Sequence, residues 1–341
     1  MSDPQNPRAA ALLEVEDLHV TFGRKHKTYA VNGVSFTVNA GETLALVGES
    51  GSGKSTTARA ALHLETPDRG RVRLMGRDLA EVRTRELRSM RRHAQMVFQD
   101  PYSSLDPSMT IMRIVEEPLR VHTAMSRDER RERVVEVLGL CGVPAAHLHR
   151  FPGEFSGGQR QRIAIARAIA TNPELVVADE AVSALDVSIR NQILNLFEDL
   201  QRKLGIAYLF ITHDLGVVEQ VAHRVAIMYL GRIVELGPTA EVFAEPRHPY
   251  TRALLDARPD LTRDVGGVRQ TIQGDPPDPT DLVQGCAFAG RCPYAVDLCR
   301  EVTPASIEID GRESACHLDG RLVAEVPGAE PSGAEPSGAG R

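Results

Sequence analysis

Residues 43–55 read TLALVGESGSGKS, a short apolar run followed by a glycine-rich loop that ends in Lys54 and Ser55. The last eight residues match the phosphate-loop pattern G-x-x-x-x-G-K-[ST] at every fixed position. Because the apolar run predicts a strand and the residues after Ser55 predict a helix, the loop lies in the strand–loop–helix context that phosphate binding requires. Without that context, the same residues would indicate only a surface loop. The sequence therefore predicts an α/β fold built around a phosphate site.

The composition of this loop explains how it could hold phosphate. Glycines let backbone N–H groups converge on phosphate oxygens, and the helix that follows adds the positive end of its dipole. Lys54 is expected to reach the β- and γ-phosphates, and Ser55 to ligate Mg²⁺. The predicted nucleotide-binding residues of the loop are Gly48, Ser50, Gly51, Ser52, Gly53, Lys54, Ser55 and Thr56.

A second apolar run, residues 175–178, ends in Asp179 and Glu180. An acidic residue after a strand often serves only as a helix N-cap. Beside a phosphate loop, however, Asp179 is placed to hold Mg²⁺, and Glu180 is then free to act as general base toward water. We favour the catalytic interpretation because the phosphate loop is present.

Strand-like and helix-like segments alternate along most of the chain, which predicts a mostly parallel sheet. Residues 12–22 and 31–38 alternate apolar and polar positions and predict an antiparallel pair of strands. Residues 224–236 predict a hairpin that turns at Gly231. The other predicted strands are 43–47, 94–98, 175–178 and 207–212, and the predicted helical segments are 110–140, 161–171 and 189–204.

The bulk composition is that of an ordinary globular protein, with 341 residues, 42% hydrophobic residues and a net charge of −6. The negative charge gives no reason to expect nucleic acid as a partner. Five arginines between residues 83 and 92 are explained more simply as a solvated helix face than as a binding patch. No run approaches the ~18 apolar residues that span a bilayer. We expect a cytosolic chain whose link to a membrane runs through a partner.

Taken in order, the motifs resemble those of the ATP-binding subunits of ABC transporters over residues 12–255. Gln99 resembles the Q-loop glutamine, which in that family contacts Mg²⁺ or water. His213 resembles the switch histidine near the γ-phosphate. The resemblance also implies Phe22 as the aromatic that stacks on the base, with Tyr29 as second choice. The signature-like residues are Ser156, Gly157, Gly158 and Gln159, and the D-loop-like run 183–186 ends in Asp186.

The resemblance implies a P-loop ABC ATPase fold with a RecA-like mixed sheet, an antiparallel β subdomain and a helical subdomain at about residues 100–165. ATP and Mg²⁺ are the implied cofactors. In the family, Ser156 and Gly158 would contact the γ-phosphate bound to the opposite subunit, so two chains assemble head to tail around ATP. A soluble ABC ATPase of the repair or translation type is the alternative. Such proteins usually carry two cassettes, a coiled coil or a basic face.

Two further segments are similar to those of oligopeptide and dipeptide importers. They are EPRHPYTRALL at residues 245–255 and VFQDPYSSLDP at residues 97–107, the latter closest to the second of the two ATPase subunits in such importers. The similarity implies import of peptides, with nickel, glutathione or oligosaccharide as alternatives. It also implies a second ATPase subunit, two membrane permease subunits, an extracytoplasmic substrate-binding protein and a place at the cytoplasmic face of the membrane.

Four cysteines, Cys286, Cys292, Cys299 and Cys316, follow the nucleotide domain with the spacing C-x5-C-x6-C-x16-C. Clustered cysteines in a cytosolic chain are more often metal ligands than disulfide partners. The spacing is wider than that of common zinc or ferredoxin sites. We favour a [4Fe–4S] cluster, a pattern that peptide importers share, over Zn²⁺ or unligated packed thiols, with His317 as an alternate ligand. Cys141, by contrast, is predicted to be a buried thiol.

The predicted domain organisation follows from these segments. An N-terminal tail covers residues 1–11, the nucleotide-binding domain residues 12–258, and a small cysteine-rich C-terminal domain residues 259–321. The last segment, 322–341, contains Gly-Ala-Glu-Pro-Ser twice, at 328–332 and 333–337; because this repeat lacks the apolar residues of a core, the segment is expected to be disordered.

Overall fold

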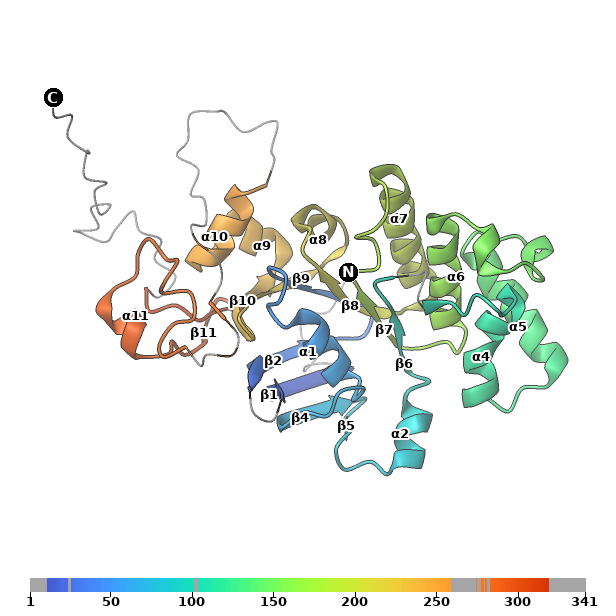
Figure 1. Cartoon of the computed structure of the whole chain (residues 1–341), viewed down its shortest axis with the longest axis horizontal. Helices are drawn as coiled ribbons and strands as arrows, with labels where there is room; N and C mark the ends of the chain where they lie inside the picture. The colour runs from blue at the N-terminus through green and yellow to red at the C-terminus, as the bar shows by residue number, and fades with distance from the viewer. Residues whose placement is uncertain are drawn as a thin grey trace, which may run out of the picture.

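The computed structural model describes residues 11–23, 26–100, 104–258 and 283–318, together with residues 274, 277, 278 and 280. The predicted tail 322–341 lies outside the described residues, as do most of the N-terminal tail and of the segment 259–282. The α/β class is confirmed, because an eight-stranded mixed sheet and a four-stranded antiparallel sheet carry helices around them (Figure 1).

The main sheet has the strand order β11-β12-β10-β9-β3-β8-β7-β6. Its parallel part consists of β3 (Thr43–Val47), β6 (Ala94–Val97), β7 (Leu175–Asp179), β8 (Ala207–Thr212) and β9 (Arg224–Tyr229). Every residue of β3, β7 and β8 is buried, as expected for parallel strands that are covered on both faces. β3, β7 and β8 were predicted as apolar strands, β6 was predicted at 94–98, and β9 was predicted as the first strand of the hairpin at 224–236.

The smaller sheet has the order β2-β1-β4-β5 and is antiparallel throughout. Its strands are β1 (Leu13–Phe22), β2 (Thr28–Val38), β4 (Arg69–Leu74) and β5 (Arg77–Asp78). The predicted antiparallel pair is therefore confirmed. The alternating apolar residues of β1 and β2 pack on α1 (Lys54–Ala61) and on one face of the main sheet in a shared hydrophobic core.

Three helices, α4 (Ile111–His122), α5 (Arg127–Leu140) and α6 (Gly157–Ile169), form a layer at one end of the molecule (Figure 1). The single helical segment predicted at 110–140 is two helices, because Ser126 starts a new one. The Ser126 hydroxyl accepts the Glu129 N–H at 3.3 Å, and the Glu129 carboxylate accepts the Ser126 N–H at 2.6 Å. This capping box was readable from the sequence Ser-x-x-Glu.

The remaining helices connect the strands or cover the sheets. Helix α2 (Thr84–Met90) carries Arg85 and Arg88 of the arginine-rich run, and Arg83 is its N-cap; all three are exposed, in keeping with a solvated helix face. Cys141, which caps the end of α5, is fully buried as predicted, and burial raises its pKa to about 12. The remaining helices are α2 (Thr84–Met90), α7 (Val187–Leu204), α8 (Leu215–Val221), α9 (Thr239–Ala244), α10 (Pro249–Asp256) and α11 (Asp297–Glu301), with short 3-10 turns at Ala145–His147 and Pro152–Glu154.

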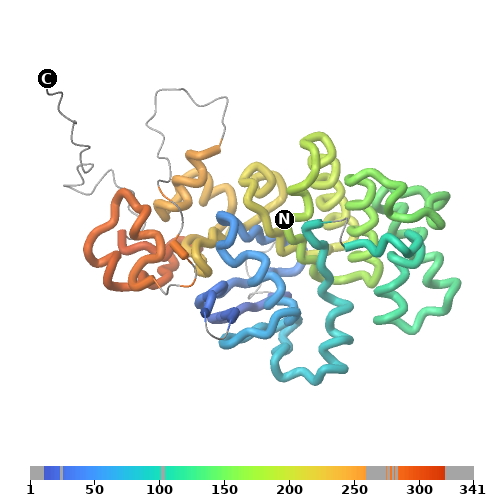
Figure 2. Tube along the Cα trace, in the orientation of Figure 1, coloured from blue at the N-terminus to red at the C-terminus, as the bar shows by residue number. Residues whose placement is uncertain are grey.

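The C-terminal segment, defined here as residues 283–318, joins the edge of the main sheet. It supplies β11 (Ile307–Ile309) and β12 (Arg312–Ser314), and β12 pairs with β10 (Arg232–Pro238), the second strand of the hairpin predicted at 224–236. Figure 2 shows this segment, in orange and red, beside β10 at the end opposite α4 and α5.

A buried ion pair anchors this segment to the sheet. Glu235 on β10 is fully buried and accepts a hydrogen bond from the Arg312 guanidinium at 3.0 Å. The same carboxylate accepts the backbone N–H groups of Arg247 and His248, each at 2.9 Å. Because a buried carboxylate without such partners is costly, these contacts fix the C-terminal segment in one place.

No helix among the described residues is both long and apolar enough to cross a bilayer.

Candidate nucleotide-binding and catalytic site

The predicted phosphate loop connects β3 to α1 and lies close against the neighbouring strands. A Cβ atom on Gly48 would lie 2.1 Å from the carbonyl oxygen of Met228, and one on Gly53 would lie 2.0 Å from that of Ala30. Gly53 also has a φ of 97°, a backbone conformation that favours glycine. Glycine is thus required at both positions by the packing of the loop.

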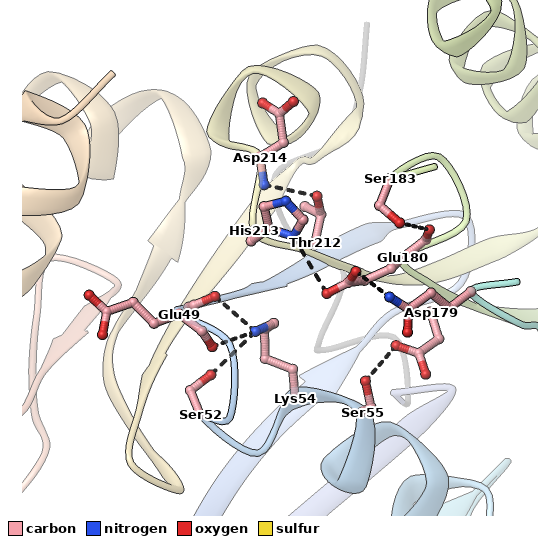
Figure 3. Close-up of polar contacts among 12 residues, drawn as sticks. Glu49, Ser52, Lys54, Ser55, Asp179, Glu180, Ser183, Thr212, His213 and Asp214 are labelled. Carbon is pink, nitrogen blue, oxygen red and sulfur yellow. Dashed lines mark hydrogen bonds and ion pairs between the residues drawn. The ribbon is translucent and has the colours of Figure 1, made fainter. Parts of the chain in front are cut away.

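Lys54 is buried at the start of α1, and its ammonium group points back into the loop (Figure 3). Its Nζ donates to the carbonyl oxygens of Gly48 and Glu49, both at 2.8 Å, and lies 3.4 Å from the hydroxyl of Ser52. Burial lowers the pKa of Lys54, whereas the nearby carboxylates, Glu180 first among them, act to raise it. A phosphate group entering the loop would compete with these carbonyls for the ammonium donors.

Ser55 and Asp179 meet directly beside the loop, although they are 124 residues apart in the chain. The Ser55 hydroxyl donates to Asp179 Oδ1 at 2.7 Å. Asp179 is buried at the end of β7, where burial raises its pKa and the hydrogen bond from Ser55 acts in the opposite direction. A hydroxyl and a carboxylate are the hard oxygen ligands that Mg²⁺ prefers, so these two residues fit the predicted metal role.

Glu180 is the centre of a second group of polar side chains. Its Oε2 accepts a hydrogen bond from Gln99 Nε2 at 2.8 Å. Its Oε1 lies 3.5 Å from Nδ1 of His213, and Figure 3 shows these two side chains facing each other. The three residues follow β6, β7 and β8, which are neighbours in the sheet. Because parallel strands end at the same edge, the fold collects these three side chains at one place.

The backbone around Glu180 is held in an uncommon conformation. Its φ is 46°, in the left-handed region, and its N–H donates to the Ile211 carbonyl oxygen at 3.0 Å. The Ser183 hydroxyl donates to the Glu180 carbonyl oxygen at 2.9 Å. Non-glycine residues in this region are often found where a functional side chain must point in a fixed direction.

The phosphate loop, Gln99, Glu180 and His213 line one cavity of about 800 Å³. Phe22 lies on its wall and Tyr29 does not, which favours Phe22 over Tyr29 as the stacking aromatic. Ser52, although part of the loop, is buried and is not among the residues that line the cavity. The lining residues are Phe22, Thr28, Ala30, Val47, Gly48, Glu49, Ser50, Gly51, Gly53, Lys54, Ser55, Thr56, Gln99, Glu180, His213, Leu215 and Leu254.

The signature-like residues lie away from this cavity, at the start of α6. Ser156 is the exposed N-cap of that helix: its hydroxyl is 3.4 Å from the Gln159 N–H, and its own N–H donates to Gln159 Oε1 at 3.0 Å. Gly158 packs on α7, where a Cβ atom would lie 2.5 Å from Ile189 Cγ2. Among the described residues that line the cavity, none belongs to the run 156–159, and exposed Asp186 at the start of α7 is also outside it.

Two residues near the site were not predicted from the sequence. Asp214 caps α8 by accepting the Gly216 N–H at 2.9 Å, binds Arg190 at 2.6 Å, and donates its own N–H to the Thr212 hydroxyl at 3.0 Å. These contacts fix the backbone on both sides of His213. The Asp residue before an apolar helix was a readable N-cap signal. Glu49 is the second, and nothing in the local pattern distinguished it.

The four C-terminal cysteines lie near one another, but the predicted metal site is not supported. Burial raises the pKa of Cys292 to about 12, and the other three thiols add to the effect. The Cys286 N–H donates to the Cys299 carbonyl oxygen at 2.7 Å. Within the part of the chain that the structure describes, however, no group of three or more His, Cys, Asp or Glu residues is arranged to hold a metal ion. His317, the predicted alternate ligand, contacts the Val302 carbonyl oxygen at 2.7 Å instead.

Taken together, the loop, the Ser55–Asp179 pair and the carboxylate of Glu180 define a nucleoside-triphosphate hydrolase of the phosphate-loop class. Comparison with known proteins identifies the family within this class. Residues 31–183 match the family described as ABC transporter, and residues 234–299 match the family described as oligopeptide/dipeptide transporter, C-terminal region.

Several curated relatives are similar over most of their length. The probable peptide ABC transporter ATP-binding protein y4tS of Sinorhizobium fredii is 53% identical over 290 residues, which cover 85% of this chain and 82% of the relative. The di/tripeptide transport ATP-binding protein DppF of Pseudomonas aeruginosa is 50% identical, with 84% and 89% covered. The oligopeptide transport ATP-binding protein AppF of Bacillus subtilis is 47% identical, with 85% and 89% covered.

The fold is similar to that of solved ABC proteins as well. The dimeric post-hydrolysis structure of the ATP-binding cassette MJ0796 bound to ADP and Pi has a TM-score of 0.61 at 30% identity and covers 67% of this chain and 98% of the other. The chain belongs to the ABC transporter family and is an ATP-binding, ATP-hydrolysing member of it. Its fold is the P-loop ABC ATPase fold, for which ATP and Mg²⁺ are the expected cofactors.

Proposed function

We propose that this chain is the ATPase subunit that powers the import of peptides, or of a related small solute, through membrane permease subunits. The observation that carries the proposal is the pairing of two family matches on one chain. The ABC transporter match at 31–183 is followed by the oligopeptide/dipeptide transporter match at 234–299. Relatives at 47–53% identity are named as ATP-binding proteins of peptide transport.

In this proposal, different residues in and beside the cavity bind the nucleotide, hold Mg²⁺ and activate the attacking water. Lys54 exchanges its loop carbonyls for the β- and γ-phosphates, and Phe22 stacks on the base. Mg²⁺, held by Ser55 and Asp179 with Gln99 nearby, would neutralise charge on the phosphates. Glu180 accepts the proton of the attacking water, since it is the carboxylate that lies between the Gln99 amide and the His213 ring.

The proposed assembly follows from the position of the signature. Ser156 and Gly158 lie outside the cavity of their own chain, as expected if they face a nucleotide bound to another subunit. We propose a head-to-tail heterodimer with a second ABC ATPase subunit, in which Asp186 lies near the shared interface. Two permease subunits and an extracytoplasmic binding protein complete the importer. The chain would then lie at the cytoplasmic face of the membrane, without a nucleic-acid partner.

The domain organisation in this proposal comprises an ABC nucleotide-binding domain at 12–258, with its helical subdomain at about 100–165, and a small cysteine-rich domain at 259–321. The buried contact of Glu235 with Arg312 supports a stable association of the two.

The proposal is tested by isolating the full chain with its native partners and measuring uptake in proteoliposomes. We expect two permeases and a second ATPase to co-purify, and radiolabelled dipeptides or oligopeptides to enter the vesicles only with ATP present. Nickel, glutathione and an oligosaccharide are assayed in parallel. Uptake of one of these alone would correct the cargo. Recovery of nucleic acid without any membrane protein would instead favour a soluble ABC ATPase of the repair or translation type.

We also propose that Cys286, Cys292, Cys299 and Cys316 bind a metal, with a [4Fe–4S] cluster favoured over Zn²⁺. The proposal rests on the clustering of the four cysteines in the sequence and on the hydrogen bond from the Cys286 N–H to the Cys299 carbonyl oxygen at 2.7 Å, which places two of them side by side. Thiolates are the usual ligands of both groups. The metal would act as a staple for a segment that is too small to build much core of its own.

Anaerobically purified protein is expected to be brown, with broad absorbance at about 400 nm, as is typical of thiolate-ligated iron. Cys292→Ser should abolish this absorbance, whereas Cys141→Ala, at a buried thiol remote in sequence, should leave it unchanged. Metal analysis by mass spectrometry identifies the element. Colourless protein that releases zinc on acidification would replace the cluster with Zn²⁺, and metal-free protein with four titratable thiols would refute both.

A further inference from the structure

An arginine of the C-terminal segment binds a side chain of the phosphate loop. Arg291 NH1 donates to Glu49 Oε2 at 2.9 Å, and NH2 donates to Glu49 Oε1 at 3.2 Å. This two-pronged geometry is the strongest form of an arginine–carboxylate contact. The Arg291 side chain is only 8% exposed, so water screens the pair poorly. The two residues are separated by 242 positions in the sequence.

A cluster of buried aromatic side chains packs against the guanidinium of Arg291. Arg291 NH1 lies 3.3 Å from the Tyr229 hydroxyl, and its guanidinium carbon lies 5.8 Å from the centre of the Tyr229 ring. Tyr229 in turn packs against Tyr250 and Phe288, at centroid distances of 4.7 and 5.3 Å. Because Tyr229 and Tyr250 are almost fully buried, the guanidinium is held in one position.

Glu49 is fixed through its backbone as well as its side chain. Its N–H donates to the Tyr250 hydroxyl at 3.1 Å, while its carbonyl oxygen accepts the Lys54 ammonium at 2.8 Å. The Lys54 contact is lost when the ammonium turns to a phosphate. The contacts with Tyr250 and Arg291 then remain to hold this part of the loop.

The negative charge of Glu49 explains why its pairing with Arg291 matters for ATP binding. Glu49 lines the cavity that receives the triphosphate, so an unpaired carboxylate there would repel a ligand with several negative charges. In Figure 3 the Glu49 side chain extends away from Lys54. Arg291 both neutralises the carboxylate and holds it in that direction.

We propose that Arg291 is a positioning residue for ATP binding, through which the C-terminal segment forms part of the support of the phosphate loop. The proposal rests on the ATP hydrolysis already assigned to this chain and is independent of what the importer carries. Arg291 acts on the nucleotide only through Glu49. Its loss is therefore expected to weaken ATP binding rather than the chemical step.

The test is a double-mutant cycle on the full chain in its purified complex, with ATP hydrolysis and binding of a fluorescent ATP analogue as readouts. Arg291→Gln is expected to raise the KM and the Kd about tenfold and to leave kcat within about twofold, the size expected when one nearby charge is left uncompensated. Glu49→Gln/Arg291→Gln should restore the KM to within about twofold of wild type. The effect of Arg291→Gln should become smaller in about 1 M salt, where the Debye length is about 3 Å, because Glu49 is partly exposed to the cavity.

Arg258→Gln is the matched control, because Arg258 forms a more exposed ion pair with Glu219 at 2.7 Å. We expect this variant to leave the KM unchanged. Arg291→Lys keeps the charge and should recover part of the affinity. An unchanged KM in Arg291→Gln, or a double variant as weak as the single one, would overturn the proposal. If Arg291→Gln does not fold, Glu49→Gln decides: ATP binding at least as tight as wild type supports the proposal, and weaker binding refutes it.

Discussion

Glu180→Gln is expected to lower ATP hydrolysis by about 10²–10⁴-fold, the usual contribution of a general base, while ATP binding stays within about twofold of wild type. Glutamine has the shape of glutamate but cannot accept the proton of the attacking water at neutral pH. Its amide oxygen can still accept the hydrogen bond that Gln99 now donates at 2.8 Å. The geometry of the site should therefore persist while the chemistry fails.

Phosphate release and ATP-analogue binding, measured on the same purified complex, separate these two effects. Glu174→Gln is the matched control, because Glu174 stands just before the start of β7, is partly exposed, and its carboxylate lies 2.9 Å from Nδ1 of His93 rather than beside the phosphate loop. We expect that variant to hydrolyse ATP at the normal rate. Full activity in Glu180→Gln would mean that the catalytic site of the complex lies on another chain.

The parallel sheet and the residues at its edge could be predicted because each depends on a local pattern. The strands β7 and β8 are continuous apolar runs, and a polar residue at the end of each is brought to the common edge by topology alone. The meeting of Gln99, Glu180 and His213 thus required only the correct order of strands. Ser126, which divides the segment 110–140, was signalled just as locally but was missed.

The parts that could not be predicted depend on contacts between distant segments. Arg291 and Glu49 are separated by 242 residues, and neither position carries a pattern that points to the other. The way in which β12 extends the main sheet likewise depends on contacts between distant segments, among them the buried pair of Glu235 with Arg312. The cysteines are a different case: their clustering in the sequence predicts a metal site, but no group of three or more His, Cys, Asp or Glu side chains among the described residues is arranged around a metal ion, so the structure does not support that prediction.

Ser156→Arg is expected to lower ATP hydrolysis by the assembled complex by about 10²-fold, comparable to the loss of one preorganised donor at a reacting phosphate. The bulky cation would stand where the start of α6 is proposed to face a nucleotide on the partner subunit. The chain's own affinity for ATP should be unchanged, since Ser156 is not among the residues that line its cavity. Binding of an ATP analogue by the isolated chain, and ATP-dependent association with the partner subunit, measure the two effects separately.

Loss of a helix cap alone costs about 0.5–2 kcal/mol, so the effect on stability must be separated from the effect at the interface. Ser126→Arg provides the control, because Ser126 is also the exposed N-cap of a helix in the same layer and closes an equivalent capping box with Glu129. Both variants lose one cap, but only Ser156 lies in the signature-like run. If Ser156→Arg leaves hydrolysis and ATP-driven association as intact as Ser126→Arg does, the signature does not complete a partner's site.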